Sequence, residues 1–252
     1  MELTFLGRGN SMNRNEEHTS AYCRAHNTLL LINCGMRVFE KIVSLHLLED
    51  IEKVKIILTS NESKNNSSLA HFITYLKETM HFMPKQIVLY SGEDTDVDIF
   101  LLTQGIVEKE DYLYREVHKK MDVFELNMAV EFFATAHKRG IRNYGLVLED
   151  RTRKVVYLAD SREIHPFIKD WLLEGELDRL YVSVEVRGER EGTYAFTYEE
   201  LLSFFKDLPC KERIHMMDLN EAFDDLYQYQ AKVEGFQIVN PARQKENRPA
   251  YR

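Results

Sequence analysis

Potentially reactive side chains lie in the polar segment that follows the apolar run Val54–Leu58. Within it, Glu62 can offer a carboxylate oxygen to a metal, whereas Ser60 is a weak neutral ligand and Asn65 offers only an amide oxygen. Lys64 has a reference pKa near ~10.4, so its side chain stays positively charged unless it is strongly desolvated. An ammonium at this place repels a dication, so the segment by itself is a poor metal site.

The surrounding pattern predicts elements that place this segment at the end of a strand. Strands are expected at Met1–Gly7, Thr19–Cys23, Thr28–Ile32, Val54–Leu58, Gln86–Tyr90, Val123–Glu125, Val130–Ala134, Tyr144–Glu149, Val155–Leu158, Leu180–Glu185 and Arg213–Met216. Helices are expected at Val38–Leu48, Ser67–His81, Val97–Gln104, Ile164–Leu173 and Thr197–Asp207. Strands that alternate with helices in two halves predict an α/β protein, an αββα sandwich of two mixed sheets flanked by helices.

The N-terminal segments Met1–Asn10, His18–Tyr22 and Leu29–Gly35 resemble the opening strands of metallo-β-lactamase-fold hydrolases. Within that fold the chain resembles the ribonuclease Z-like phosphodiesterases and the related viral enzymes that cleave cyclic mononucleotide signals. In that family the strand corresponding to Lys55–Thr59 is followed by His-x-His-x-Asp-His. The resemblance puts Ser60, Glu62, Lys64 and Asn65 on the four ligand positions, so the motif is degenerate.

Three later positions match the family's remaining ligands. The resemblance implies that His137 in Ala134–His137, Asp160 in Val155–Ser161 and His215 in Arg213–His215 correspond to a histidine ligand, the bridging aspartate and the final histidine. With Glu62 they could form a residual site for one zinc or manganese ion, because three protein ligands and a water suffice for catalytic zinc. The alternative, which we expect, is that no cofactor binds. Lys64 then pairs with Asp160 or Glu62 in place of the metal, and Lys64 and His18 contribute to a ligand pocket.

Three functions remain open at this stage. The first is a pseudoenzyme that retains the fold and binds a nucleotide or a partner protein without hydrolysis. The second is an active metal-dependent phosphodiesterase, acting on cyclic mononucleotides or another phosphodiester and requiring a metal at His137, Asp160 and His215. The third is a structural partner of an intact paralogue. The resemblance also implies a homodimer.

Composition limits the class of protein further. The chain has 252 residues, of which 44% are hydrophobic, which fits a single domain at 1–239 followed by a tail at 240–252 that has no apolar periodicity. The net charge of −8 argues against a long nucleic acid as ligand and leaves a small nucleotide possible. Three cysteines without CxxC spacing and the lack of a membrane-spanning apolar stretch predict a cytoplasmic protein. The run Asp218–Asp225 carries four carboxylates and is interpreted as a solvated acidic turn.

Overall fold

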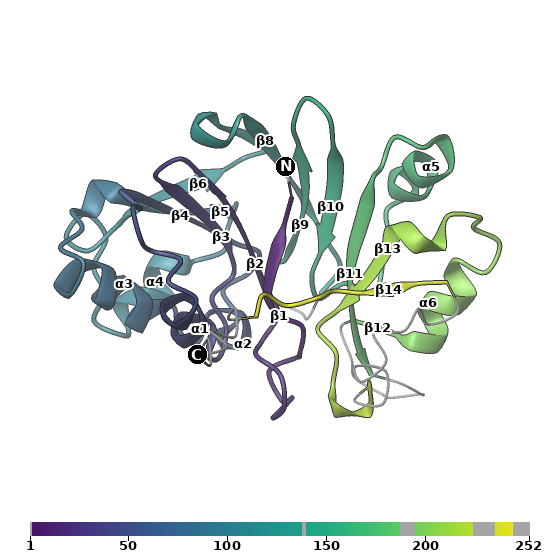
Figure 1. Cartoon of the computed structure of the whole chain (residues 1–252), viewed down its shortest axis with the longest axis horizontal. Coiled ribbons are helices and arrows are strands. Elements are labelled where there is room, and N and C mark those ends of the chain that lie inside the picture. Colours follow the sequence, from purple (N-terminus) through teal and green to yellow (C-terminus); the bar gives the residue numbers. More distant parts are fainter. Residues whose placement is uncertain (1, 138–139, 187–194, 224–234, 244–252) are drawn as a thin grey trace, which may run out of the picture.

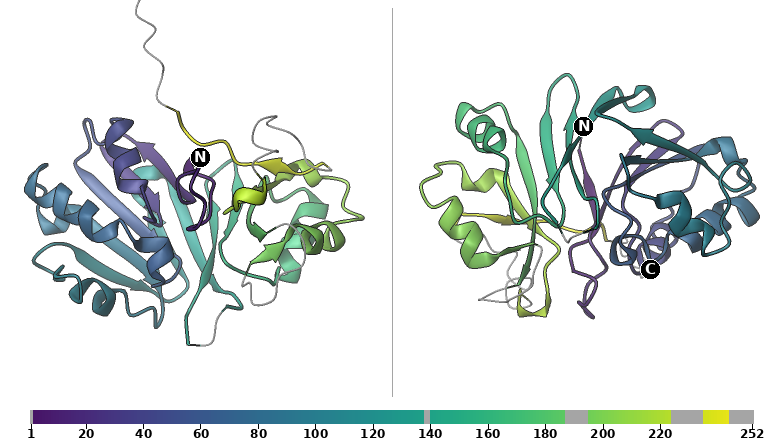
Figure 2. Two further views of the ribbon diagram at one scale, coloured as in Figure 1. Left: turned by 90° about the horizontal axis from the view of Figure 1, so that it is seen from below. Right: turned by 180° about the vertical axis from the view of Figure 1, so that it is seen from behind.

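The computed structural model describes residues 2–137, 140–186, 195–223 and 235–243. Two β-sheets pack face to face, and helices cover the outer face of each sheet (Figure 1). The same layers are visible from below and from behind (Figure 2). The expected αββα sandwich is therefore confirmed.

The first sheet contains six strands in the order of the sequence, with the first three antiparallel and the last four parallel. These strands are β1 (Thr4–Gly7), β2 (Ser20–Ala25), β3 (Thr28–Ile32), β4 (Lys53–Leu58), β5 (Ile87–Gly92) and β6 (Leu113–Val117). Its helices are α1 (Val38–Ser44), α2 (Ser63–Asn66), α3 (Leu69–Glu78) and α4 (Val97–Leu102), with a 3₁₀ turn at Pro84–Gln86.

The second sheet has the order β14-β13-β11-β10-β9-β8-β7, and β12 pairs with β11 outside this path. Its strands are β7 (Lys120–Val123), β8 (Met128–Ala134), β9 (Tyr144–Glu149), β10 (Lys154–Leu158), β11 (Arg179–Val186), β12 (Phe196–Thr197), β13 (Ile214–Met217) and β14 (Gln237–Ile238). Its helices are α5 (Pro166–Glu174) and α6 (Tyr198–Phe204), and 3₁₀ turns occur at Phe124–Leu126, Lys211–Arg213 and Glu221–Phe223.

The side chains of β3 explain why the sheets stack. Leu29 and Leu31 belong to the core cluster beneath the helices of the first sheet, whereas Leu30 and Ile32 belong to the cluster between the two sheets. Successive strand residues point to opposite faces, so an uninterrupted apolar strand must be covered on both sides. The second sheet supplies the cover on the inner side.

Two features of the sequence-based assignment need correction. The expected strand Val123–Glu125 is wrong beyond Val123, because β7 ends at that residue and a 3₁₀ turn follows. The turn ends at Asn127, whose backbone is in the left-handed region at φ 50°. Strands β6, β12 and β14, and the part of β7 before Val123, were not expected from the sequence. Exposed polar residues occupy much of β6 and β7, so their apolar pattern is weak.

The chain beyond β14 returns to the first sheet (Figures 1 and 2). Pro241 forms a β-bridge with Phe5, and the Ala242 backbone N–H donates to the Phe5 carbonyl at 2.7 Å. The start of the expected tail is therefore attached to β1, and residues from 244 onward lie outside the described part. Among the described residues, no helix is long and apolar enough to span a membrane.

Candidate functional site

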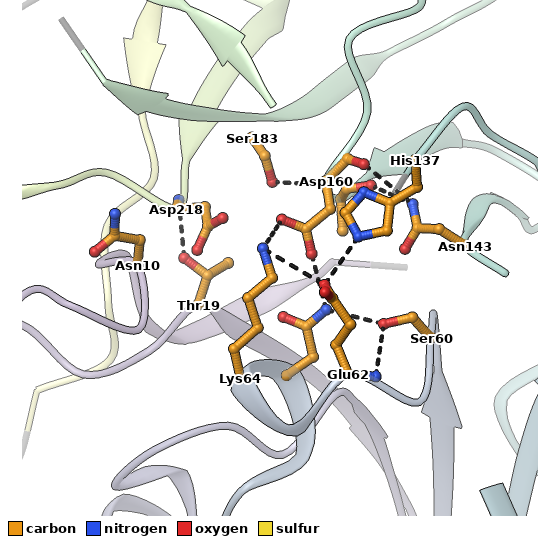
Figure 3. Close-up of polar contacts among 12 residues, drawn as sticks. Asn10, Thr19, Ser60, Glu62, Lys64, His137, Asn143, Asp160, Ser183 and Asp218 are labelled. Carbon is orange, nitrogen blue, oxygen red and sulfur yellow. Dashed lines mark hydrogen bonds and ion pairs between the residues drawn. The ribbon is translucent and has the colours of Figure 1, made fainter. Parts of the chain in front are cut away.

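Polar side chains from both sheets meet where β4, β10 and β13 end (Figure 3). Ser60 and Glu62 follow β4, Asp160 follows β10, and Asp218 follows β13. The carboxyl ends of parallel strands are where ligands bind in open α/β sheets, because the loops that leave them diverge and form a crevice.

The turn after β4 is held by amide side chains. The Asn65 side chain donates to Ser60 Oγ at 3.2 Å and to Asp160 Oδ2 at 2.8 Å, which ties the first sheet to the second. The neighbouring Asn66 side chain donates to the Ser60 carbonyl at 2.7 Å. Both asparagines are buried, so their amide groups gain little from water and depend on these bonds.

Lys64 lies between two carboxylates. Its Nζ is 2.6 Å from Asp160 Oδ1 and 3.7 Å from Glu62 Oε2. Burial lowers the pKa of Lys64, but the negative charges of Asp160 and other nearby carboxylates outweigh it and leave the pKa above its usual range. The amine is therefore an ammonium at neutral pH, and the pairing expected from the sequence is confirmed.

Asp160 is the most buried carboxylate of the cluster, with its side chain 2% exposed. Burial raises its pKa, whereas the Lys64 charge and the Asn65 hydrogen bond lower it, and the balance leaves the pKa below its usual range. Its backbone is in the left-handed region at φ 47°, and its N–H donates to Ser183 Oγ at 3.2 Å. The sharp turn after β10 thus directs the carboxylate toward the turn after β4.

His137 contacts Glu62, with Nε2 2.9 Å from Oε2. A carboxylate can only accept, so Nε2 carries the hydrogen in this contact. Burial raises the pKa of Glu62, whereas the hydrogen bond from His137 and the charge of Lys64 lower it. The lowering is larger, so the pKa lies below its usual range. Glu62 is therefore a carboxylate shared by an imidazole and an ammonium.

His18 and Asp218 extend the cluster on the far side of Lys64. His18 Nε2 lies 3.8 Å from Asp218 Oδ1, and neither ring nitrogen of His18 has a hydrogen-bond partner within the described ranges. Burial lowers the pKa of His18 to about 4, so the ring is neutral at pH 7. The Asp218 N–H donates to Thr19 Oγ1 at 2.9 Å, which joins the end of β13 to the start of β2.

His215 does not join this cluster. It is the second residue of β13, and its ring packs against Tyr181 with a centroid distance of 5.2 Å. It lines a separate cavity with residues of β1, β11 and β14. The structure thus brings together Ser60, Glu62, Lys64, Asn65, His137 and Asp160, with His18 beside them, and places His215 elsewhere.

Asp218 is the site residue that the sequence interpretation missed. It is 5% exposed, which corrects its assignment to a solvated acidic turn, while Asp224 and Asp225 lie outside the described residues. The sequence feature that could have indicated Asp218 is its position just after the strand β13, because Asp160 follows the strand β10 in a similar way. The family resemblance pointed to His215 as the final histidine ligand, but His215 lies inside β13 and does not reach the crevice at the end of that strand.

A metal ion does not fit the cluster as it stands. No three His, Cys, Asp or Glu residues in the described part of the chain converge on a point that could hold a metal. The space between Asp160 and Glu62, which a dication would need, receives the Lys64 ammonium. Two cations cannot share it, because their repulsion and the missing ligands would both oppose binding.

A cleft of about 830 Å³ opens above the cluster. Glu62, Ser63 and Lys64 lie on its lining, with Asn10, Ser11, Met12, Asn61, Asp96, Ile99, Phe100, Gly140 and Ile141 around them. Its size is in the range of small-molecule sites, and its lining is mixed, with polar and charged residues beside the apolar side chains of Met12, Ile99, Phe100 and Ile141.

Comparison with solved structures identifies the fold. The chain is similar to the metallo-β-lactamase fold protein YhfI from Bacillus subtilis, with a TM-score of 0.69 and 19% identity over 96% of this chain and 95% of that one. It is similar to a diphosphatase of the PhnP family at a TM-score of 0.71 and 18% identity, over 96% and 95% of the two chains. Human tRNase Z, short form, matches at a TM-score of 0.70 and 14% identity, over 96% and 97%.

This protein therefore has the metallo-β-lactamase fold, as the opening segments of the sequence indicated. No protein-family model matches the chain, and a search of curated proteins also found no match. At this level of identity the likeness concerns the fold, so the function must be argued from the site.

Proposed function

We propose that this chain is a non-catalytic metallo-β-lactamase-fold protein that binds a small ligand in the cleft above Lys64. The observation that carries the proposal is the ion cluster in which Lys64 contacts Asp160 and Glu62. A two-metal hydrolase of this fold needs several ligands for each ion to activate water. In this chain a tethered ammonium neutralises part of the buried negative charge, which favours a folded pocket without metal.

The ligand we propose is a small nucleotide. The cleft volume of about 830 Å³ is compatible with such a molecule. Ile99, Phe100 and Ile141 offer apolar surface for a base, while Asn10 and Ser63 offer hydrogen-bonding groups for a sugar or phosphate. Lys64 is 25% exposed, so its ammonium can also reach a ligand from the floor of the cleft.

Hydrolysis is tested with bis(p-nitrophenyl) phosphate and with cyclic AMP, each in the presence of added zinc or manganese. The expected result is no metal-dependent rate above that of an Asp160→Asn variant. Metal-stimulated turnover that disappears in Asp160→Asn would instead favour the active phosphodiesterase.

Ligand binding is tested by titration calorimetry with cyclic AMP and cyclic UMP. The matched variant is Ile99→Glu, because Ile99 is 57% exposed at the cleft and its replacement does not disturb the core. Saturable binding that is lost in Ile99→Glu supports a nucleotide site in the cleft. If no nucleotide binds, the proposal that the ligand is a small nucleotide is contradicted. The proposal that the protein is non-catalytic is tested separately by the hydrolysis assay.

Two further expectations stay proposals. The homodimer rests on the family resemblance, and light scattering after size-exclusion chromatography tests it through the particle mass. The cytoplasmic location rests on the cysteine usage of the sequence and is tested by fractionating cells that express the tagged protein.

A further inference from the structure

A row of polar side chains lies on the inner face of the second sheet, toward the amino ends of its strands. Tyr181 of β11 is in register with His215 of β13, and His215 is in register with Gln237 of β14. Arg179 stands two residues before Tyr181 and so shares its face. The neighbouring inner-face positions, including Tyr157 and Met217, belong to the apolar core between the sheets. Tyr181 belongs to this core as well, and the polar residues Arg179, His215 and Gln237 beside it need an explanation.

A cavity opens over this row. It has a volume of about 320 Å³ and is lined by Arg179, Tyr181, His215 and Gln237 together with residues 2–5 of the β1 segment and residues 238–240. A second cavity of about 200 Å³ adjoins it and shares Glu2, Leu3, Arg179 and Tyr181 with it. The larger cavity lies at the opposite end of β13 from Asp218, so it is separate from the cleft above Lys64.

The polar side chains of this cavity include four that can donate hydrogen bonds, from Arg179, Tyr181, His215 and Gln237, and one carboxylate, from Glu2. The Arg179 guanidinium donates to Tyr181 Oη at 3.3 Å, and its contact with Glu2 is a loose one at 3.8 Å with the Glu2 side chain 66% exposed. His215 and Gln237 have no side-chain hydrogen bond to any other residue in the described ranges, so their N–H groups are available. Burial and the nearby Arg179 charge lower the pKa of His215 to about 4, so its ring is neutral at pH 7 and carries one N–H donor.

We propose that this cavity, formed by Arg179, Tyr181, His215 and Gln237, is a second binding site that takes a small molecule bearing a carboxylate. The planar guanidinium matches a carboxylate with two parallel hydrogen bonds, and the Tyr181, His215 and Gln237 side chains can donate to the remaining lone pairs. Within the described lining of the larger cavity, Arg179 is the single charged donor. One positive charge suits a monoanion better than a phosphate dianion, whose second charge would be left without a partner.

The site is tested on the full chain by NMR titration with sodium benzoate at pH 7, following the His215 ring signal, with sodium chloride at equal ionic strength as the control. The ring signal is assigned by its disappearance in His215→Gln. The expected result is a saturable shift of this signal, together with a rise in the His215 pKa, because a bound anion stabilises the imidazolium. Arg179→Lys keeps the charge but loses the planar fork, and we expect it to weaken benzoate binding about tenfold or more.

Controls separate this site from the cleft and from a phosphate site. Ile99→Glu places a negative charge at the cleft and should leave benzoate binding unchanged. The proposal is overturned if no saturable shift occurs, if chloride produces the same shift, or if Arg179→Lys binds benzoate as tightly as the wild type. It is also overturned if Ile99→Glu weakens binding, which would assign benzoate to the cleft, or if inorganic phosphate binds more tightly than benzoate. The outcome is independent of the proposed loss of catalysis.

Discussion

The Nζ atom of Lys64 lies 2.6 Å from Oδ1 of Asp160, although the two residues follow strands of different sheets and are 96 positions apart in the sequence. Asp160 is nearly completely buried, so the ammonium is its principal neutralising charge. This one contact joins the turn after β4 to the turn after β10 and determines what the site can hold.

Replacing Lys64 should therefore destabilise the fold. In Lys64→Met the Asp160 carboxylate remains buried without its ion partner, and removing one member of such a pair costs about 3 kcal/mol of unfolding free energy. Chemical denaturation at pH 7 measures this loss. The double variant Lys64→Met/Asp160→Asn removes both charges, and we expect it to be more stable than Lys64→Met alone. Additive effects of the two substitutions would show that the pair is not coupled.

The stability of the protein should decrease as the pH is lowered from 6.5 to 4, because His18 is buried in its neutral form. The folded pKa of His18 is about 4, below the reference value of 6.5, so in this range the unfolded chain binds a proton that the folded chain does not. The stability associated with neutral His18 is fully present above pH 6.5 and is lost as the pH falls to 4. The size of the effect is about 3 kcal/mol.

The matched variant for this pH effect is His18→Gln. His215 has a similarly lowered pKa and contributes in the same direction, so the variant should retain part of the pH dependence and lose the part that belongs to His18. Unfolding free energies at pH 7 and pH 5 give the difference. An equal slope in the wild type and in His18→Gln would contradict the neutral, buried state of this ring.

Gly35 should not tolerate a side chain. A Cβ at this position would lie 2.2 Å from His18 Nδ1 and 2.9 Å from the Lys64 carbonyl oxygen. Gly35→Ala therefore forces the His18 ring or the turn that bears Lys64 to move, at a cost of about 1–3 kcal/mol. The measurement is thermal and chemical unfolding of Gly35→Ala alone and combined with His18→Ala. A smaller effect of Gly35→Ala in the His18→Ala background is expected, and a Gly35→Ala protein as stable as the wild type would show that the packing is looser than the structure indicates.

The sequence was most informative where a strand pattern and a resemblance coincided. The run Thr28–Ile32 is apolar at every position, and it is the strand β3, buried on both faces. The end of β4 was equally clear, so the four degenerate motif positions were placed in the correct turn, and the charge of Lys64 indicated its pairing with a carboxylate.

The remainder depended on geometry that a sequence does not contain. Asp218 and His215 are three residues apart, and the choice between them depends on where β13 ends, which is Met217. The contacts of Asn65 and Asn143 with the turn after β10 also join distant segments, and single amide residues carry no local signal for this role. Polar strands such as β6 were missed because their stability comes from pairing with β5 rather than from an apolar pattern.

Metal content tests the central claim most directly. Protein purified without chelator is measured by elemental analysis for zinc and manganese, beside a His137→Ala variant that lacks one of the possible ligands. The proposed role of Lys64 predicts far less than one equivalent of either metal in both proteins, with the wild type folded. A full equivalent in the wild type that disappears in His137→Ala would contradict it, because Lys64 would then have to leave its place between Asp160 and Glu62.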